Sequence, residues 1–229
     1  MQKLAFFDLD KTIYRRYSLE EVRIHLRRNF SNLKWSEKEE KKITKSFQDH
    51  KSNYNETVNK LLDLTASMLK NFREDEIDNL YRDIFKNSHK EYYSWVELVF
   101  DFLNQNDWVS YLITGSLKPA AYHIVQKLKF EEIYASEFEI KNNKYTSKII
   151  KIVNDKAKAI ITKSILEEYP DRLTIGFGDS LGDIPMLELV DIPFIIDNKK
   201  EYMLNLAQSR NWTVTQKANT IIKEIKKIF

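Results

Sequence analysis

The sequence contains no cysteine, which excludes a disulfide framework and a thiolate metal site. It also lacks any apolar run close to the roughly 18 residues that a transmembrane helix needs. No basic leader with an apolar core precedes Asp8, and no nucleic-acid-binding motif is present. We therefore expect a cytoplasmic protein without a transmembrane segment, a cleaved leader or a nucleic-acid partner.

Neither glycine nor proline occurs between residues 15 and 91, and this region shows no clear strand pattern. Its apolar residues recur at helical spacing, and Ser18 is a plausible N-cap for the first helix. These features predict a small all-helical unit. In the rest of the chain strands and helices alternate, which predicts an α/β fold: a Rossmann-like parallel sheet with helices on both faces.

The composition, 42% hydrophobic and 31% charged over 229 residues, is that of a globular protein with one large or two small domains. The formal net charge is only +3, but five arginines gather early in the chain, at positions 15, 16, 23, 27 and 28. Such a cluster is typical of a solvated helix face. Alternatively, it attracts an anionic substrate or a membrane surface.

An apolar run at Leu4–Phe7 ends in two acids, Asp8 and Asp10. The run predicts a buried parallel strand, and the carboxyl end of such a strand is where open α/β sheets bind ligands. Carboxylates this close repel each other, so the pair favours a bound cation. It also offers one oxygen as nucleophile and one as acid or base. The same pattern is typical of an ordinary polar turn.

A second apolar run, at residues 173–177, ends in Gly178 and two further acids, Asp179 and Asp183. Glycine lets the backbone approach a ligand or an ion closely. The two acidic strand ends could converge on one hard cation. Mg²⁺ would accept them, with waters and a substrate phosphate at its other positions.

Four motifs in order give the chain a resemblance to the haloacid dehalogenase superfamily. They are Asp8-x-Asp10-x-Thr12, then Thr114-Gly115 after the apolar run 108–113, then Lys156 before a helix, and Gly178-Asp179-Ser180-x-x-Asp183. Residues 178–188 resemble its phosphoserine-phosphatase-like branch. The resemblance implies a core of residues 1–14 and 92–229, a helical cap of residues 15–91 inserted after the first strand, and a hairpin before the third motif. An Asn142-Asn143 turn agrees with that hairpin.

The resemblance also implies a chemistry. Mg²⁺ is expected on Asp8, Asp179 and the backbone carbonyl of Asp10. Asp8 would attack the phosphorus of a phosphomonoester and form an aspartyl-phosphate. Asp10 would protonate the leaving oxygen and then take a proton from the hydrolytic water.

The phosphate itself needs hydrogen-bond donors and a balancing charge. Thr114 and the amides of Gly115 and Ser116, at a predicted strand-to-helix junction, can donate to it. Lys156 is expected to supply the charge, since its sequence neighbourhood favours it over Lys158. Thr12, Ser180 and Asp183 are expected to support the site. Asp183 could bind the metal through water, hold Lys156 and Ser180, or simply cap the helix that contains Pro185.

We therefore expect a Mg²⁺-dependent phosphatase of a small phosphomonoester. One alternative, suggested by the arginines, is the same chemistry on a lipid phosphate head group, such as lysophosphatidate or phosphatidylglycerophosphate, with peripheral membrane contact. Another is a binding protein of the same fold, which the complete catalytic set disfavours. Two departures count against phosphoserine. The resemblance to phosphoserine phosphatases implies an acid within residues 14–18, but this stretch has none, and the nearest acids, Glu20 and Glu21, come slightly late. It also implies an asparagine directly before Asp183, where this chain has Gly182.

Overall fold

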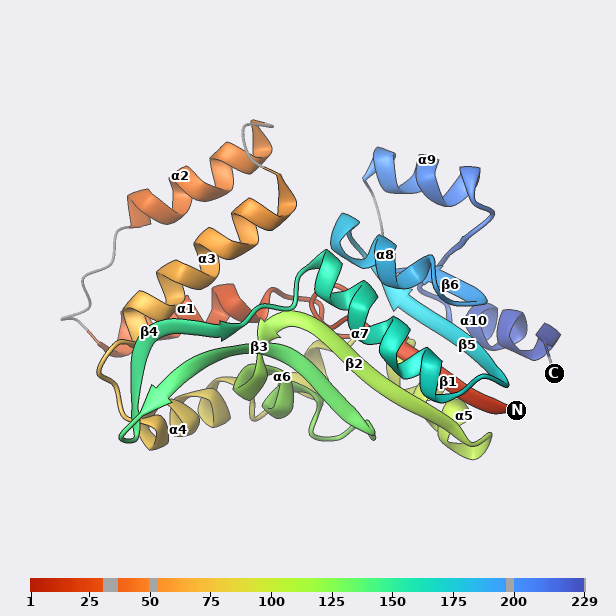
Figure 1. Cartoon of the computed structure of the whole chain (residues 1–229), viewed down its shortest axis with the longest axis horizontal. Helices are drawn as coiled ribbons and strands as arrows, with labels where there is room; N and C mark the ends of the chain where they lie inside the picture. Colours follow the sequence, from red (N-terminus) through yellow and green to blue (C-terminus); the bar gives the residue numbers. More distant parts are fainter. Residues whose placement is uncertain (31–36, 50–52, 197–199, 229) are drawn as a thin grey trace.

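The described part of the chain is built on one seven-stranded sheet (Figure 1). The computed structural model describes residues 1–30, 37–49, 53–196 and 200–228. The strand order is β4-β3-β2-β1-β5-β6-β7. The strands are β1 (Gln2–Phe7), β2 (Trp108–Leu117), β3 (Glu132–Lys141), β4 (Lys144–Lys151), β5 (Arg172–Gly178), β6 (Ile192–Ile195) and β7 (Thr213–Val214). All neighbours pair in parallel except β3 and β4, which form an antiparallel hairpin. The predicted fold class and the predicted hairpin are confirmed.

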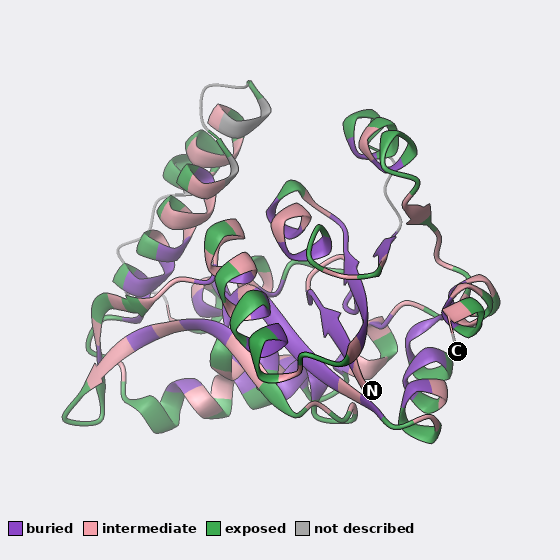
Figure 2. Cartoon of the chain, turned by 45° about the vertical axis from the view of Figure 1, so that its right-hand side comes forward, coloured by how far each residue is buried: buried purple, intermediate pink, exposed green. Residues whose placement is uncertain are grey.

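The central strand β1 is buried on both faces, which explains its unbroken apolar sequence. Successive side chains point to opposite sides: Ala5 and Phe7 enter one core, and Leu4 and Phe6 enter the other. On the first side lie α5 (Val96–Gln105), α6 (Lys118–Val125) and α10 (Ala218–Ile225). On the second lie α7 (Asp155–Glu168), α8 (Ile184–Leu187) and α9 (Glu201–Ser209). Figure 2 shows the buried strands between these helices.

The register of the sheet sets the strand ends side by side. Phe7 at the end of β1 pairs with Phe177 of β5, and their rings stack with centroids 4.5 Å apart. Directly beyond this pair, the Asp8 amide donates a hydrogen bond to the Phe177 carbonyl at 3.0 Å. The two acidic segments therefore leave the sheet at the same edge.

Residues 15–91 contain α1 (Ser18–Asn29), α2 (Glu37–Gln48), α3 (Tyr54–Leu69), α4 (Glu74–Phe85) and a short 3-10 turn at Ser88–Glu91. Their described part is helical, as expected. The β3–β4 hairpin reaches across to them, because Tyr145 exchanges backbone hydrogen bonds with Asn71 and Phe72 at 2.9 and 3.0 Å. No local sequence pattern predicts this contact. Among the described residues, no helix is long and apolar enough to cross a membrane.

Candidate active site

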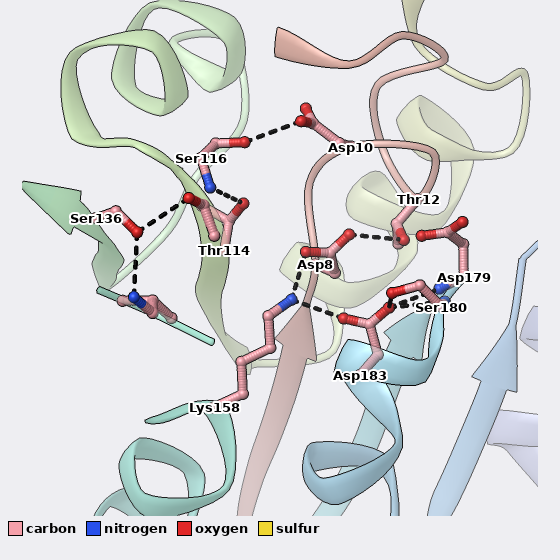
Figure 3. A network of polar contacts seen from close by, with 12 residues as sticks. Asp8, Asp10, Thr12, Thr114, Ser116, Ser136, Lys158, Asp179, Ser180 and Asp183 are labelled. Atoms are coloured by element: carbon pink, nitrogen blue, oxygen red, sulfur yellow. Dashed lines mark hydrogen bonds and ion pairs between the residues drawn. The ribbon is translucent and has the colours of Figure 1, made fainter. Parts of the chain in front are cut away.

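Three carboxylates meet at the carboxyl edge of the sheet (Figure 3). Asp8 follows β1, Asp179 follows β5, and Asp183 lies in the 3-10 turn Leu181–Asp183. One oxygen from each lies within 4.8 Å of the others. All three are almost completely buried, so their charges are poorly screened by water. Sequence reasoning identified all three, since each follows an apolar strand.

The structure corrects the choice of lysine. Lys158, not Lys156, reaches the carboxylates: its Nζ lies 2.5 Å from Asp8 Oδ1 and 2.6 Å from Asp183 Oδ1. Lys156 is exposed. The physical reason is helix phase, because residues two apart point to nearly opposite sides of a helix.

A sequence signal for Lys158 was available. Asn154 is the N-cap of α7, accepting a hydrogen bond from the Ala157 amide at 3.0 Å. Counted from that cap, Lys158 shares the buried face of the helix with Thr162, Ile165 and Leu166, at spacings of four, seven and eight. A lysine on that apolar stripe must find a buried anion.

Asp183 organises the loop after β5. Its Oδ2 accepts hydrogen bonds from the Asp179 amide, the Ser180 amide and the Ser180 hydroxyl, at 3.0, 2.9 and 2.9 Å. Asp183 is also the N-cap residue of α8, the helix that contains Pro185, but its side chain makes no capping hydrogen bond to that helix. Gly178 makes this packing possible, because a Cβ there would lie 2.4 Å from the Asp183 Cβ. Asp183 thus joins Lys158 to the loop that carries Asp179.

Asp8 is held on both oxygens, by Lys158 at Oδ1 and by the Thr12 hydroxyl at Oδ2, the latter at 3.2 Å. Burial, followed by the charge of Asp183, raises the pKa of Asp8 to about 6. The same two causes raise the pKa of Asp179 well above its usual range. A bound cation would relieve this repulsion. The three carboxylates, with oxygens this close, are a donor set that fits Mg²⁺.

Asp10 lies beside this cluster and faces β2 (Figure 3). Its Oδ2 accepts hydrogen bonds from the Ser18 amide, the Ser18 hydroxyl and the Ser116 hydroxyl, each at 3.0 Å. Burial, followed by the charge of Asp8, raises the pKa of Asp10 to about 7. Ser18 is the first residue of α1, not its N-cap, which is Tyr17. Sequence reasoning missed its contact with Asp10, since no motif includes it.

The last residues of β2 include Thr114, Gly115 and Ser116, so these three lie within the strand and not beyond it. The helix α6 begins directly afterwards, at Lys118. The predicted end of the strand at Ile113 is therefore four residues early. The strand continues because β3 supports it: the Ser136 hydroxyl donates to the Gly115 carbonyl at 2.9 Å. The Ser116 amide donates to the Thr114 hydroxyl at 3.1 Å. The side chains of Thr114 and Ser116 lie at the same edge of the sheet as Asp8 (Figure 3).

Curated relatives with similar sequences are phosphatases. The phosphoserine phosphatase of Methanocaldococcus jannaschii is 24% identical over 190 residues, which cover 82% of each chain. The glucosyl-3-phosphoglycerate/mannosyl-3-phosphoglycerate phosphatase of Methanococcoides burtonii is 47% identical, but over only 45 residues. This second match covers 19% of the present chain and 16% of that relative.

Solved structures show the same fold. A phospho-aspartyl intermediate analogue of phosphoserine phosphatase has a TM-score of 0.69 at 20% identity, covering 97% of this chain and 98% of the other. A protein of unknown function from Bordetella pertussis Tohama I has a TM-score of 0.75 at 18% identity, covering 93% and 98%. The family model described as haloacid dehalogenase-like hydrolase matches residues 5–188, which include all four motifs. The chain belongs to the haloacid dehalogenase-like hydrolase family.

Proposed function

We propose that this chain is a Mg²⁺-dependent phosphatase of a small phosphomonoester. The observation that carries the proposal is the buried group of Asp8, Asp179, Asp183 and Lys158 at the carboxyl edge of the sheet. A phosphate dianion repels an anionic nucleophile, so catalysis requires positive charge and alignment at that point. The names of the relatives, both phosphatases, support the substrate class.

In this proposal Asp8 is the nucleophile and Asp10 the general acid and base. Asp8 forms a bond to phosphorus while the ester oxygen departs with a proton from Asp10. Asp10 then takes a proton from the water that attacks the aspartyl-phosphate, which releases phosphate and restores Asp8. Asp8, Asp179 and the Asp10 carbonyl would hold the Mg²⁺, which supplies positive charge beside the phosphoryl group.

The other site residues bind the transferred group. Thr114 and the amides of Gly115 and Ser116 would donate hydrogen bonds to phosphate oxygens. Lys158 takes the role first expected of Lys156, since it already contacts Asp8. Its positive charge would offset the nucleophile and the phosphoryl group.

We also propose that residues 15–91 act as a cap on a core of residues 1–14 and 92–229. One contact between the two parts supports the role of the insert as a cap. Asn55 of α3 donates to the Asp155 carboxylate at 2.8 Å, at the first residue of α7. The insert therefore reaches the helix that carries Lys158.

Three of the five clustered arginines do not favour a lipid phosphate as the substrate. Arg15 and Arg16 pair with Glu91, at 3.5 and 2.9 Å, and Arg16 also pairs with Glu21 at 3.0 Å. Arg23 is buried against Glu40, with the two charges 2.7 Å apart. Because these guanidinium groups already face carboxylates, they offer little uncompensated charge to a membrane.

The test is phosphate release from a panel of small phosphomonoesters and lipid phosphates, with Mg²⁺ and with chelator. We expect turnover of at least one small ester with Mg²⁺, none in chelator, and none for Asp8→Asn. Equal turnover with and without chelator would overturn the metal assignment. Full activity of Asp8→Asn would overturn the nucleophile, and a preference for vesicle-bound lipid phosphates would reverse the choice of substrate.

A further inference from the structure

Asp10 is held in an asymmetric way. All three of its hydrogen-bond donors, the Ser18 amide, the Ser18 hydroxyl and the Ser116 hydroxyl, approach Oδ2 at 3.0 Å. In the part of the chain that the structure describes, Oδ1 is buried and has no hydrogen-bond partner. Leaving a buried acceptor unpaired is unfavourable. A leaving-group oxygen or a water at Oδ1 would remove that cost.

The donors distinguish the two oxygens of Asp10. Donors gathered at Oδ2 hold that oxygen in place and leave Oδ1 without a hydrogen-bond partner among the described residues. This arrangement makes Oδ2 the anchored oxygen and Oδ1 the one available for proton transfer.

Ser18 contributes more to this anchoring than Ser116. It supplies both an amide and a hydroxyl, and it is completely buried. Its amide is at the start of α1, where backbone donors have no partner inside the helix, and the N-cap residue Tyr17 makes no side-chain capping bond. Asp10 thus accepts the hydrogen bond that a capping residue would otherwise accept. The Ser18 and Ser116 hydroxyl oxygens lie 2.7 Å apart, so that α1 and β2 meet at Asp10.

We propose that Ser18 and Ser116 are positioning residues that fix Asp10 through Oδ2 and direct Oδ1 to the leaving-group oxygen. This inference rests on the proposed phosphatase function. It links the start of the insert to proton transfer, because Ser18 begins the first insert helix. Neither serine touches the reacting atoms in this role; each acts through Asp10.

The test uses a series of phosphomonoesters with leaving groups from nitrophenol to a simple alcohol. Ser18→Ala removes the hydroxyl. Ser18→Pro also removes the amide donor, and proline suits the first position of a helix that follows an extended residue such as Tyr17. Because general acid catalysis contributes about 10²–10⁴-fold, we expect Ser18→Ala to lower kcat/KM about tenfold for the alkyl ester and less than threefold for the nitrophenyl ester.

We expect the loss to grow in the order Ser116→Ala, Ser18→Ala, Ser18→Pro for the alkyl ester. Ser88→Ala is the control, since Ser88 is as buried as Ser116 but donates to the Ile124 carbonyl in another region, at 2.9 Å. In an Asp10→Asn background, Ser18→Ala should cause no further loss, because positioning acts only through Asp10.

A leaving-group dependence unchanged from wild type in both Ser18→Ala and Ser116→Ala would overturn the inference while leaving the phosphatase function intact. The inference would also be overturned if Ser18→Ala lowered kcat/KM in the Asp10→Asn background as much as it does in wild type. Melting curves of each variant separate misfolding from mispositioning, and Ser116→Ala keeps the test decisive where a Ser18 variant fails to fold. If wild type hydrolyses no ester in the series, the proposed function itself fails.

Discussion

Replacing Lys158 by alanine should remove the charge that holds Asp8 and Asp183 together. The lysine Nζ contacts both carboxylates, at 2.5 and 2.6 Å, and the residue is 2% exposed. Removing one member of such a buried ionic group costs about 3–5 kcal/mol. For a chain of this size each kcal/mol corresponds to about 2–4 °C, so Lys158→Ala should melt roughly 6–20 °C below wild type in chelator. Mg²⁺ should recover part of that loss, because a bound cation neutralises the same carboxylates.

The catalytic loss should be separate from the loss of stability. If Lys158 offsets charge on Asp8 and the phosphoryl group, its removal should lower kcat/KM for an aryl phosphate by about 10²–10³-fold, the usual effect of deleting one electrostatic contact to a transition state. The assay belongs at 25 °C with saturating Mg²⁺, well below the melting transition of the variant.

Lys156→Ala is the matched control, two residues away on the same helix and exposed. An exposed substitution of this kind changes stability by about 0.5 kcal/mol or less. We expect its melting temperature and its kcat/KM to match wild type. Equal losses in the two variants, or wild-type activity in Lys158→Ala, would refute the assignment of the buried lysine.

Three further outcomes are expected. Asp10→Asn with a nitrophenyl phosphate should give a burst of phenol and then slow turnover, because the intermediate lacks its base. Peptide mapping should place the trapped phosphoryl group on Asp8, and a burst without any phosphoryl group on Asp8 would contradict its role as nucleophile. Phosphoserine should rank below the best ester in a substrate panel, and Glu20→Gln should leave that ranking unchanged. If phosphoserine ranks first with wild type and loses that rank with Glu20→Gln, the argument against phosphoserine as the substrate is wrong. Gly178→Ala should destabilise the protein by about 1–3 kcal/mol in urea unfolding, because its Cβ would overlap the Asp183 side chain, and an unchanged midpoint would show that the loop can shift.

Much of the site could be predicted from local sequence. Asp8 and Asp179 each end an apolar run, and a run that is buried on both faces has to stop where polar residues begin. The parallel sheet then brings the two strand ends to one edge, so the position of these acids follows from the strand pattern. The α/β class and the helical insert followed from alternation and periodicity in the same way.

Tertiary structure decided the features that depend on contacts between distant segments. Lys156 and Lys158 are the same residue type two positions apart; the apolar stripe of α7 favours Lys158, and the packing of α7 against the second core brings its Nζ to Asp8. The Tyr145 backbone bonds to the insert and the Ser18–Ser116 contact join residues 73 or more positions apart, across which no local periodicity operates. The sequence alone therefore determined which strand ends carry acids, since burial acts on each strand locally. Only the folded chain brought Lys158, Ser18 and Ser116 to those acids, because that depends on how α7 packs on the sheet and on how the insert meets β2.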